Sequence, residues 1–165
     1  MAWLDVLIPE FDHEMGTTRR LLERVPQDGL GWKPHPRSMS LGELAQHVAT
    51  LPMWGHVTLA RAELDLAEGP RPELVHTVEG LLALFDGHVR QARATLAAAA
   101  AAEFTAPWTL KQQGKPLFTM PKIVVWRSFV MSHLVHHRGQ LALYLRMNDV
   151  PVPSIYGPSA DEAVF

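Results

Sequence analysis

Apolar residues recur at steps of three and four positions through most of the chain, which is the pattern of amphipathic helices. This pattern predicts four long helices, over residues 7–25, 41–67, 74–96 with the alanine run that follows, and 121–148. Pro9 is expected in the first turn of the first helix, where a missing backbone N–H costs little. Pro52 is expected to bend the second helix, because it removes one internal hydrogen bond.

The connections between these helices are equally marked. Residues 26–37 are dense in proline and glycine and predict a long crossing connection between the first two helices. Ser40 and Glu43 have the spacing of a capping box, which places the start of the second helix at Leu41. A break in the chain is expected at Gly69, Pro70 and Pro72.

Two further segments complete the predicted fold. Residues 108–110 and 117–119 flank a Gln-Gln-Gly turn, which predicts a small hairpin-like connector before the last helix. Residues 150–165 contain three prolines and should be ordered only by packing on the bundle. The predicted fold class is therefore all-α, a four-helix bundle forming a single domain over residues 1–165.

Composition excludes several classes of function. The chain has 165 residues, with 15 basic and 17 acidic residues and a formal charge of -2, so no nucleic-acid footprint is expected. It has no cysteine, which excludes disulfides, thiolate metal sites and a cysteine nucleophile. The N-terminus carries no basic start, and no apolar run reaches the roughly 18 residues of a membrane span, so a soluble, cytoplasmic protein without membrane contact is expected.

Nine histidines stand among these few charges, and imidazole is the commonest metal ligand in proteins. His133 and His137 lie four residues apart on the last predicted helix, so their rings can share one ion. Leu134 stands where the zinc-protease motif HExxH requires glutamate, which disfavours a peptidase. His47 lies among inward-facing leucines and valines of the second helix and is the best third ligand.

The residues alone leave two readings of these histidines open. The pair and His47 can form a three-histidine metal site, or each ring can simply hydrogen-bond a carbonyl in the core. His136 points away from the shared face of His133 and His137 and is expected to pack or to support a ligand rather than to bind metal. A carboxylate-bridged dimetal site is disfavoured, because the Glu-x-x-His pairs that such sites use are missing.

Four segments carry a family resemblance. They are residues 32–36 (Trp-Lys-Pro-His-Pro), 41–47 (Leu-Gly-Glu-Leu-Ala-Gln-His), 133–141 (His-Leu-Val-His-His-Arg-Gly-Gln-Leu) and 152–157 (Val-Pro-Ser-Ile-Tyr-Gly). Over essentially the whole chain the sequence resembles the DinB/YfiT-like family, whose members are regarded as metalloenzymes. The resemblance implies a four-helix bundle, often a homodimer, in which His47, His133 and His137 hold a divalent ion such as nickel or zinc. Iron is also acceptable to imidazole ligands.

The resemblance also suggests a reaction. Relatives include enzymes that transfer the small thiols bacillithiol or mycothiol to electrophiles, which implies a thiol cosubstrate and a small-molecule substrate. That thiol must come from outside, because this chain has no cysteine. Two alternatives are a metal-dependent hydrolase, in which the ion activates water, and a non-catalytic metal- or ligand-binding bundle.

Residues around the expected metal site are less well defined by the sequence. Trp54 and Tyr156 are expected to wall the substrate pocket, Trp54 beside a proline bend and Tyr156 on the C-terminal tail. Five carboxylates on different elements are candidates for a general base: Asp12, Glu14, Glu43, Asp86 and Asp161.

Overall fold

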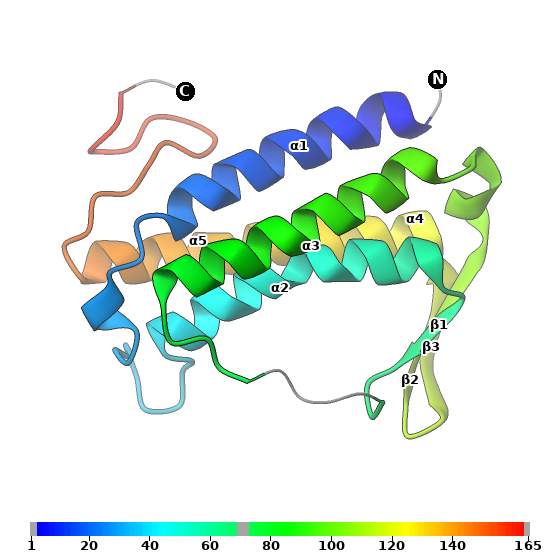
Figure 1. Ribbon diagram of the computed structural model, residues 1–165, viewed down its shortest axis with the longest axis horizontal. Coiled ribbons are helices and arrows are strands. Elements are labelled where there is room, and N and C mark those ends of the chain that lie inside the picture. Colours follow the sequence, from blue (N-terminus) through cyan, green and yellow to red (C-terminus); the bar gives the residue numbers. More distant parts are fainter. Residues whose placement is uncertain (1–2, 69–72, 164–165) are drawn as a thin grey trace.

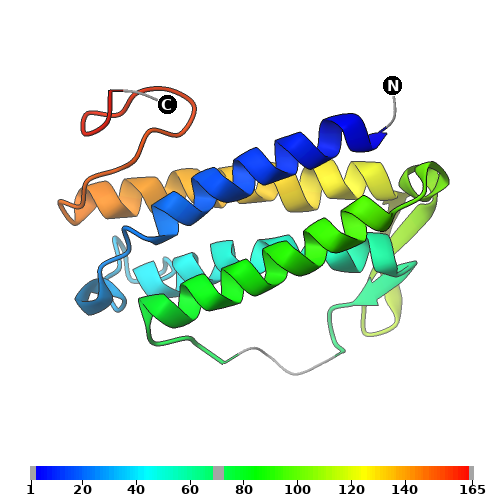
Figure 2. The ribbon, with the colours of Figure 1, turned by 45° about the horizontal axis from the view of Figure 1, so that its top comes forward.

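The computed structural model describes residues 3–68 and 73–163, in which four long helical rods lie side by side (Figure 1). The first three rods are α1 (Trp3–Leu22), α2 (Leu41–Ala60) and α3 (Val78–Ala98). The fourth consists of three consecutive pieces, α4 (Lys122–Val125), a π-helical segment (Trp126–Ser132) and α5 (His133–Met147). Figure 2 shows these three pieces as one continuous rod behind α1. The predicted four-helix bundle is confirmed in outline.

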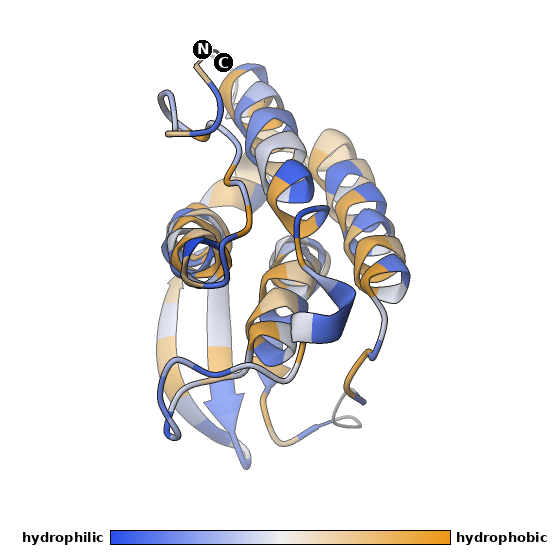
Figure 3. Ribbon diagram, turned by 90° about the vertical axis from the view of Figure 1, so that its left-hand side faces the viewer, coloured by the Kyte–Doolittle hydropathy of each residue, from blue (hydrophilic) through white to orange (hydrophobic). Residues whose placement is uncertain are grey.

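The core lies between the four rods. Each rod contributes fully buried side chains from its apolar stripe, for example Phe11 of α1, Val48 of α2, Phe85 of α3 and Leu141 of α5. Figure 3 views the rods nearly end-on, with the sheet to one side of them. Burial of these stripes is the main driving force for assembling the bundle.

The second and fourth rods approach each other closely. A Cβ atom at Gly55 of α2 would lie 3.0 Å from the indole ring of Trp126, which is fully buried. Glycine therefore allows α2 to pack directly on the last rod at this point. The close packing matters for function, because these two rods carry the candidate metal ligands.

The all-α prediction is wrong in one respect, because a small three-stranded sheet closes one end of the bundle (Figure 1). Its strands are β1 (Glu63–Asp65), β2 (Pro107–Gln112) and β3 (Lys115–Pro121). The antiparallel pair β2 and β3 is the hairpin that the sequence predicted. Strand β1 pairs with β2 in parallel, with Glu63 opposite Thr109. The prediction that the second helix reaches residue 67 is therefore wrong, and the helix ends at Ala60.

The carboxylate of Asp65 joins β1 to the hairpin turn. It accepts hydrogen bonds from the backbone N–H groups of Ala67 and Gln113, both at 2.9 Å, and of Gly114 at 2.5 Å. These bonds hold the pKa of Asp65 below its usual value, and the bond from Ala67 makes the largest contribution. Gln113 and Gly114 have positive φ angles of 51° and 76°, so the Gln-Gly turn suits the tight hairpin.

Other predicted boundaries shift by a few residues. The first helix starts at Trp3 and ends at Leu22, so Pro9 lies inside it and not in its first turn. The third helix starts at Val78, where the hydroxyl of Thr77 caps it, and not at residue 74. The capping box of Ser40 and Glu43 is confirmed at the start of α2, which continues through Pro52. The predicted break at residues 69–72 falls outside the described residues.

The C-terminal tail packs on the bundle, as predicted. Glu162 forms ion pairs with Arg20 and Arg24 of α1, and Asp161 pairs with Arg146 of α5. Pro153 and Ser154 are buried. No helix in residues 3–68 and 73–163 is apolar over a length that could cross a membrane.

Candidate metal centre

Three half-buried histidines from two rods converge between α2 and α5. His47 points inward because its neighbours at helical spacing on α2, Leu44, Val48 and Leu51, are all buried. His133 and His137 lie one turn apart on α5. Each residue offers a ring nitrogen, and these three nitrogens all lie within 4.8 Å of one another. His47, His133 and His137 are called the histidine cluster below.

The spacing of the cluster fits a shared cation. The Nε2 atoms of His47 and His133 are 3.3 Å apart. Two imidazoles on a tetrahedral ion with bonds of about 2.05 Å have nitrogens about 3.3 Å apart, which is one edge of the tetrahedron. The ring centroid of His137 lies 4.4 Å from that of His47 and 4.7 Å from that of His133. Because the third ring also offers a nitrogen within 4.8 Å of those of the other two, the donor set is that of a three-histidine site.

A π-helical turn orients His133. The backbone N–H of His133 donates to the carbonyls of Ser128 and Val130 and skips that of Phe129, which an α-helix would use. The ring of His133 hydrogen-bonds the Phe129 carbonyl instead. This bond fixes the ring while its Nε2 atom faces His47.

His137 is oriented by a side chain one turn further along α5. Its Nδ1 atom lies 2.7 Å from Oε1 of Gln140. An N–H donated from Nδ1 to this amide oxygen leaves Nε2 as the free lone pair of the ring. Two of the three rings are therefore held by hydrogen bonds that support the orientation a metal ligand needs.

The electrostatic environment keeps the three rings neutral. Burial, followed by the nearby His137 and His133, lowers the pKa of His47 to about 4. Burial also lowers the pKa of His133 and of His137, while Gln140 acts in the opposite direction on His137. Neutral imidazole is the form that binds metal, so the cluster is ready to bind at neutral pH.

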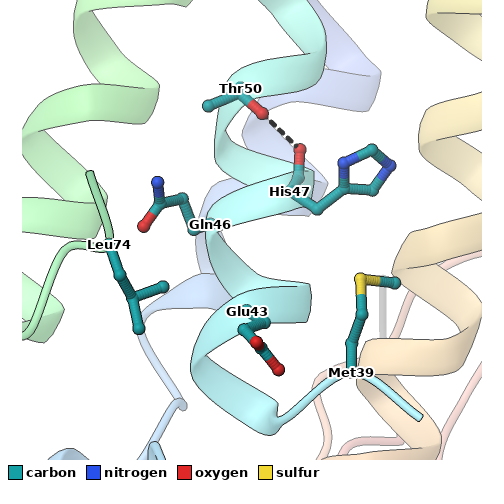
Figure 4. A pocket seen from close by; sticks show the side chains of 6 residues that line it. All are labelled: Met39, Glu43, Gln46, His47, Thr50 and Leu74. Carbon is teal, nitrogen blue, oxygen red and sulfur yellow. Dashed lines mark hydrogen bonds between the residues drawn. The ribbon is translucent and has the colours of Figure 1, made fainter. Parts of the chain in front are cut away.

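Two cavities border the cluster on different sides. The first, called the α2-side cavity, has a volume of about 330 Å³ and is lined by Met39, Glu43, Gln46, His47, Thr50 and Leu74. Figure 4 shows Glu43, Gln46, His47 and Thr50 projecting from successive turns of α2, with Met39 approaching from the chain before the helix. The second, called the Phe129 cavity, has a volume of about 380 Å³ and is lined by Ser128, Phe129, Ser132, His133 and His136. Each cavity is thus lined by one histidine of the cluster, His47 in the first and His133 in the second.

Of the two predicted pocket walls, Trp54 lies close to a cavity without lining it. Its ring stacks on that of Phe129, with centroids 6.3 Å apart, and contacts Trp108 at 6.5 Å. Tyr156 lines neither of the two cavities. Its hydroxyl binds Glu14 and Arg138 on the side of α5 that faces α1. The structure thus brings the three predicted histidines together but does not bring Tyr156 to them.

The five candidate carboxylates have different environments. Four of them pair with arginines: Asp12 with Arg93, Asp86 with Arg19, Asp161 with Arg146 and Glu14 with Arg138. Glu43 lines the same cavity as His47, one helical turn away. Hydrogen bonds from the backbone of Ser40 and from Lys33 lower the pKa of Glu43. This carboxylate is therefore suited to binding a positive group and poorly suited to removing a proton.

A second polar group lies on the same turn of α5. Arg138 is 1% exposed and donates to the Glu14 carbonyl, the Thr18 hydroxyl and the Tyr156 hydroxyl. Its guanidinium also lies 2.6 Å from the carboxylate of Glu14. Glu14, Thr18, Arg138 and Tyr156 are called the Arg138 cluster below. No pattern in the sequence indicates this cluster, and none indicates Gln140 and Phe129 as supports of the histidines.

His136 lies next to the histidine cluster. It is exposed, its ring centroid lies 4.7 Å from that of His137, and it lines the Phe129 cavity. It is not a member of the three-histidine group. Its place is therefore beside the cluster, at the mouth of a cavity.

Comparison with known proteins adds a family and a fold. A family model described as the DinB superfamily matches residues 10–141. A crystal structure of a DinB-like protein from Bacillus cereus superposes with a TM-score of 0.70 and 19% identity, covering 90% of this chain and 94% of that one. A DinB-like protein from Bacillus subtilis gives a TM-score of 0.68 and 19% identity, covering 87% and 94%. Comparison with curated protein sequences gives no match.

Proposed function

Because this chain belongs to the DinB superfamily and brings three histidines together, we propose that it is a metal-dependent enzyme. In this proposal His47, His133 and His137 hold one divalent cation. The enzyme transfers a low-molecular-weight thiol to an electrophilic small molecule. Nickel and zinc are the proposed ions, with iron as a further candidate, since imidazole accepts all three.

The observation that carries the proposal is the geometry of the ring nitrogens. A direct hydrogen bond could explain one short distance between two imidazoles, but it does not explain why a third ring offers a nitrogen within 4.8 Å of both. The hydrogen bonds of His133 and His137 to Phe129 and Gln140 further resemble the outer contacts of metal ligands. Three protein ligands leave at least one coordination position for a substrate.

The proposed reaction depends on the charge of the cation and on the cavities beside the histidine cluster. A divalent cation in this cluster would supply the positive charge that lowers the pKa of a nearby thiol or water molecule. The chain itself binds and orients the reactants. His133 and His137 are fixed on one rigid helix, and each of the two cavities is lined by one ring of the cluster, His47 in one and His133 in the other.

Two cavities favour a reaction of two substrates, which is the reason to prefer transfer over hydrolysis. In the proposed transfer the thiol S–H bond breaks and its proton passes to solvent. The sulfur electron pair forms a bond to carbon, and the leaving group departs with the electrons of the broken bond. A hydrolase that uses water in place of the thiol remains the second candidate function, because the same cluster can activate water.

An activity screen tests this proposal. Protein loaded with nickel or zinc is assayed with small thiols against electrophiles, and with ester and phosphate substrates. Thiol transfer should occur with wild type and be lost in His137→Ala, which removes a proposed ligand. His76→Ala is a matched control, because His76 is exposed and lies outside the histidine cluster. Transfer that persists unchanged in His137→Ala would contradict the proposal, and hydrolysis alone would favour the second candidate.

A non-catalytic role is the third possibility, in which the ion only stabilises the bundle. In that case chelation lowers the melting temperature while no substrate turns over in either assay. A catalytic ion should instead exchange with added metal and should bind small thiols.

We also propose that the protein forms a homodimer. Leu143 and Met147 lie one turn apart on α5 and are 58% and 52% exposed, so together they present an apolar strip to solvent. Sedimentation velocity should show a dimer in wild type and a monomer in Leu143→Glu. A wild-type monomer at micromolar concentration would refute the dimer.

A further inference from the structure

The Phe129 cavity differs in chemistry from the α2-side cavity. Its lining consists of one phenyl ring, two serines and two imidazoles, with no carboxylate, ammonium or guanidinium group. The α2-side cavity contains the carboxylate of Glu43, which is itself paired with Lys33. A cationic ligand would lose hydration in the Phe129 cavity without gaining a carboxylate partner, and none of the lining side chains carries a fixed charge for an anion. This cavity therefore favours an uncharged ligand.

The ring of Phe129 is held rigidly. It packs on Phe118 of β3 with ring centroids 4.9 Å apart and planes tilted by 31°. It also stacks on Trp54 of α2 at 6.3 Å and 29°. A ring fixed by two aromatic neighbours loses little conformational freedom when a ligand binds against it. The preferred partner of such a ring is another flat aromatic ring.

Phe129 also connects the cavity to the histidine cluster. Its carbonyl accepts the hydrogen bond that orients His133, and His133 lines the same cavity. A ligand stacked on Phe129 therefore lies beside one of the three rings of the cluster. The volume of about 380 Å³ lies within the range of small-molecule sites and accommodates a substituted benzene ring.

From these observations we infer that the Phe129 cavity binds an uncharged aromatic electrophile, with its ring stacked on Phe129. This inference rests on the proposed function, because it assigns one of the two reactants of the transferase. The α2-side cavity is then left for the thiol, and the two reactants meet at the histidine cluster. Trp54 contributes indirectly, by holding the ring of Phe129 in place.

A binding measurement tests the inference without relying on activity. The probe is 2,4-dinitrotoluene, which has a flat aromatic ring and no leaving group. Calorimetric titration of the zinc-loaded wild type should show saturable binding, and Phe129→Ala should weaken it about tenfold, as expected for loss of a stacking partner. Phe129→Leu keeps an apolar side chain without a flat face and serves as the second variant if Phe129→Ala does not fold. Leu117→Ala is the control, because Leu117 is exposed on β3 and lines neither cavity.

Kinetics provide an independent readout of selectivity. With L-cysteine as the thiol, wild type and variants are compared on 1-chloro-2,4-dinitrobenzene and on iodoacetamide, which has no aromatic ring. In Phe129→Ala, kcat/KM for the aromatic substrate should fall at least tenfold more than kcat/KM for iodoacetamide. Metal content is measured for every variant, so that loss of the ion is distinguished from loss of the stacking face.

The two proposals fail in different ways. If wild type binds metal but turns over neither electrophile with any of the small thiols of the activity screen, the proposed function is contradicted, while calorimetry still decides the cavity. If dinitrotoluene does not bind, or binds Phe129→Ala as tightly as wild type, the inference about the cavity is overturned. Equal losses on both electrophiles would also overturn it, because Phe129 would then act on the histidine cluster and not on an aromatic ligand.

Discussion

His137 and Arg138 are neighbours in the sequence, yet they belong to two polar groups with opposite properties. The Arg138 cluster faces α1 and the tail, and its buried charges match one another: Arg138 is 1% exposed and pairs with Glu14, which is 8% exposed. The histidine cluster faces α2 and consists of neutral rings with their nitrogens close together.

The difference shows which group is arranged for a ligand. In the Arg138 cluster the donors of the guanidinium have acceptors within the protein, so its role is to hold α1, α5 and the tail together. In the histidine cluster, hydrogen bonds occupy the outer side of two rings, and the remaining nitrogens face one another beside two cavities. Burial of a polar group alone does not reveal function, whereas the direction of its unused lone pairs does.

The largest expected effect is the loss of metal from the histidine cluster. His137→Ala should abolish stoichiometric binding of nickel or zinc, since two histidines rarely complete a site. Elemental analysis of protein purified without a histidine tag measures the effect. His136→Ala is the matched control and should retain one equivalent of metal, because His136 lies outside the cluster. One equivalent of metal in folded His137→Ala would show that the cluster is not the metal site.

The next effect concerns the Arg138 cluster. Arg138→Met should lower the free energy of unfolding by about 3–5 kcal/mol, because it leaves the Glu14 carboxylate buried without its partner. Denaturant titration measures this loss. The double variant Glu14→Gln with Arg138→Met should recover part of it, since the unpaired charge is removed as well. A loss below about 1 kcal/mol would mean that the Arg138 cluster does not support the fold.

A smaller effect is expected at Gln140. Gln140→Leu removes the acceptor for His137 and should weaken metal binding by about 10–100-fold. Competition with a chromophoric chelator measures the affinity. Gln140→Glu keeps an acceptor oxygen at the same place and should bind metal more tightly than Gln140→Leu. Equal affinity in wild type and Gln140→Leu would show that this contact does not orient the ring.

The smallest effect is the pH dependence of the metal-free protein. The pKa of His47 is about 4 when folded and about 6.5 when unfolded, so between these values the unfolded chain binds the extra proton. His47 should therefore destabilise the fold progressively as pH falls from 6.5 towards 4, and should have no such effect above 6.5. Unfolding titrations in the presence of a chelator test this prediction. His47→Gln should show a flatter pH profile than wild type over that window, and identical profiles would refute the prediction.

The histidine cluster could be predicted because its signals are local. The four-residue spacing of His133 and His137 and the apolar neighbours of His47 depend only on helical periodicity. The hairpin and the capping box of Ser40 and Glu43 are equally local patterns, and the structure contains both.

The remaining features depend on contacts between distant segments. Strand β1 forms because residues 63–65 pair with β2, more than 40 residues away, and no local pattern encodes that pairing. The burial of Arg138 could not be predicted, because its partners lie on α1 and the tail. The π-helical segment follows an apolar pattern that resembles an α-helix, so the support that Phe129 gives to His133 could not be predicted.

The π-helical segment also makes the site sensitive to the number of residues in the last rod. A π turn accommodates one residue more than the α turn it replaces, and each residue of an α-helix turns the chain by about 100°. Deleting a single residue within Trp126–Ser132 would therefore close this segment into regular α-helix, with α5 still facing α2 but without the π turn beside His133. Conversion to regular α-helix would also return the Phe129 carbonyl to the backbone ladder. The number of residues in the last rod therefore affects the geometry of the site even when the histidines themselves are unchanged.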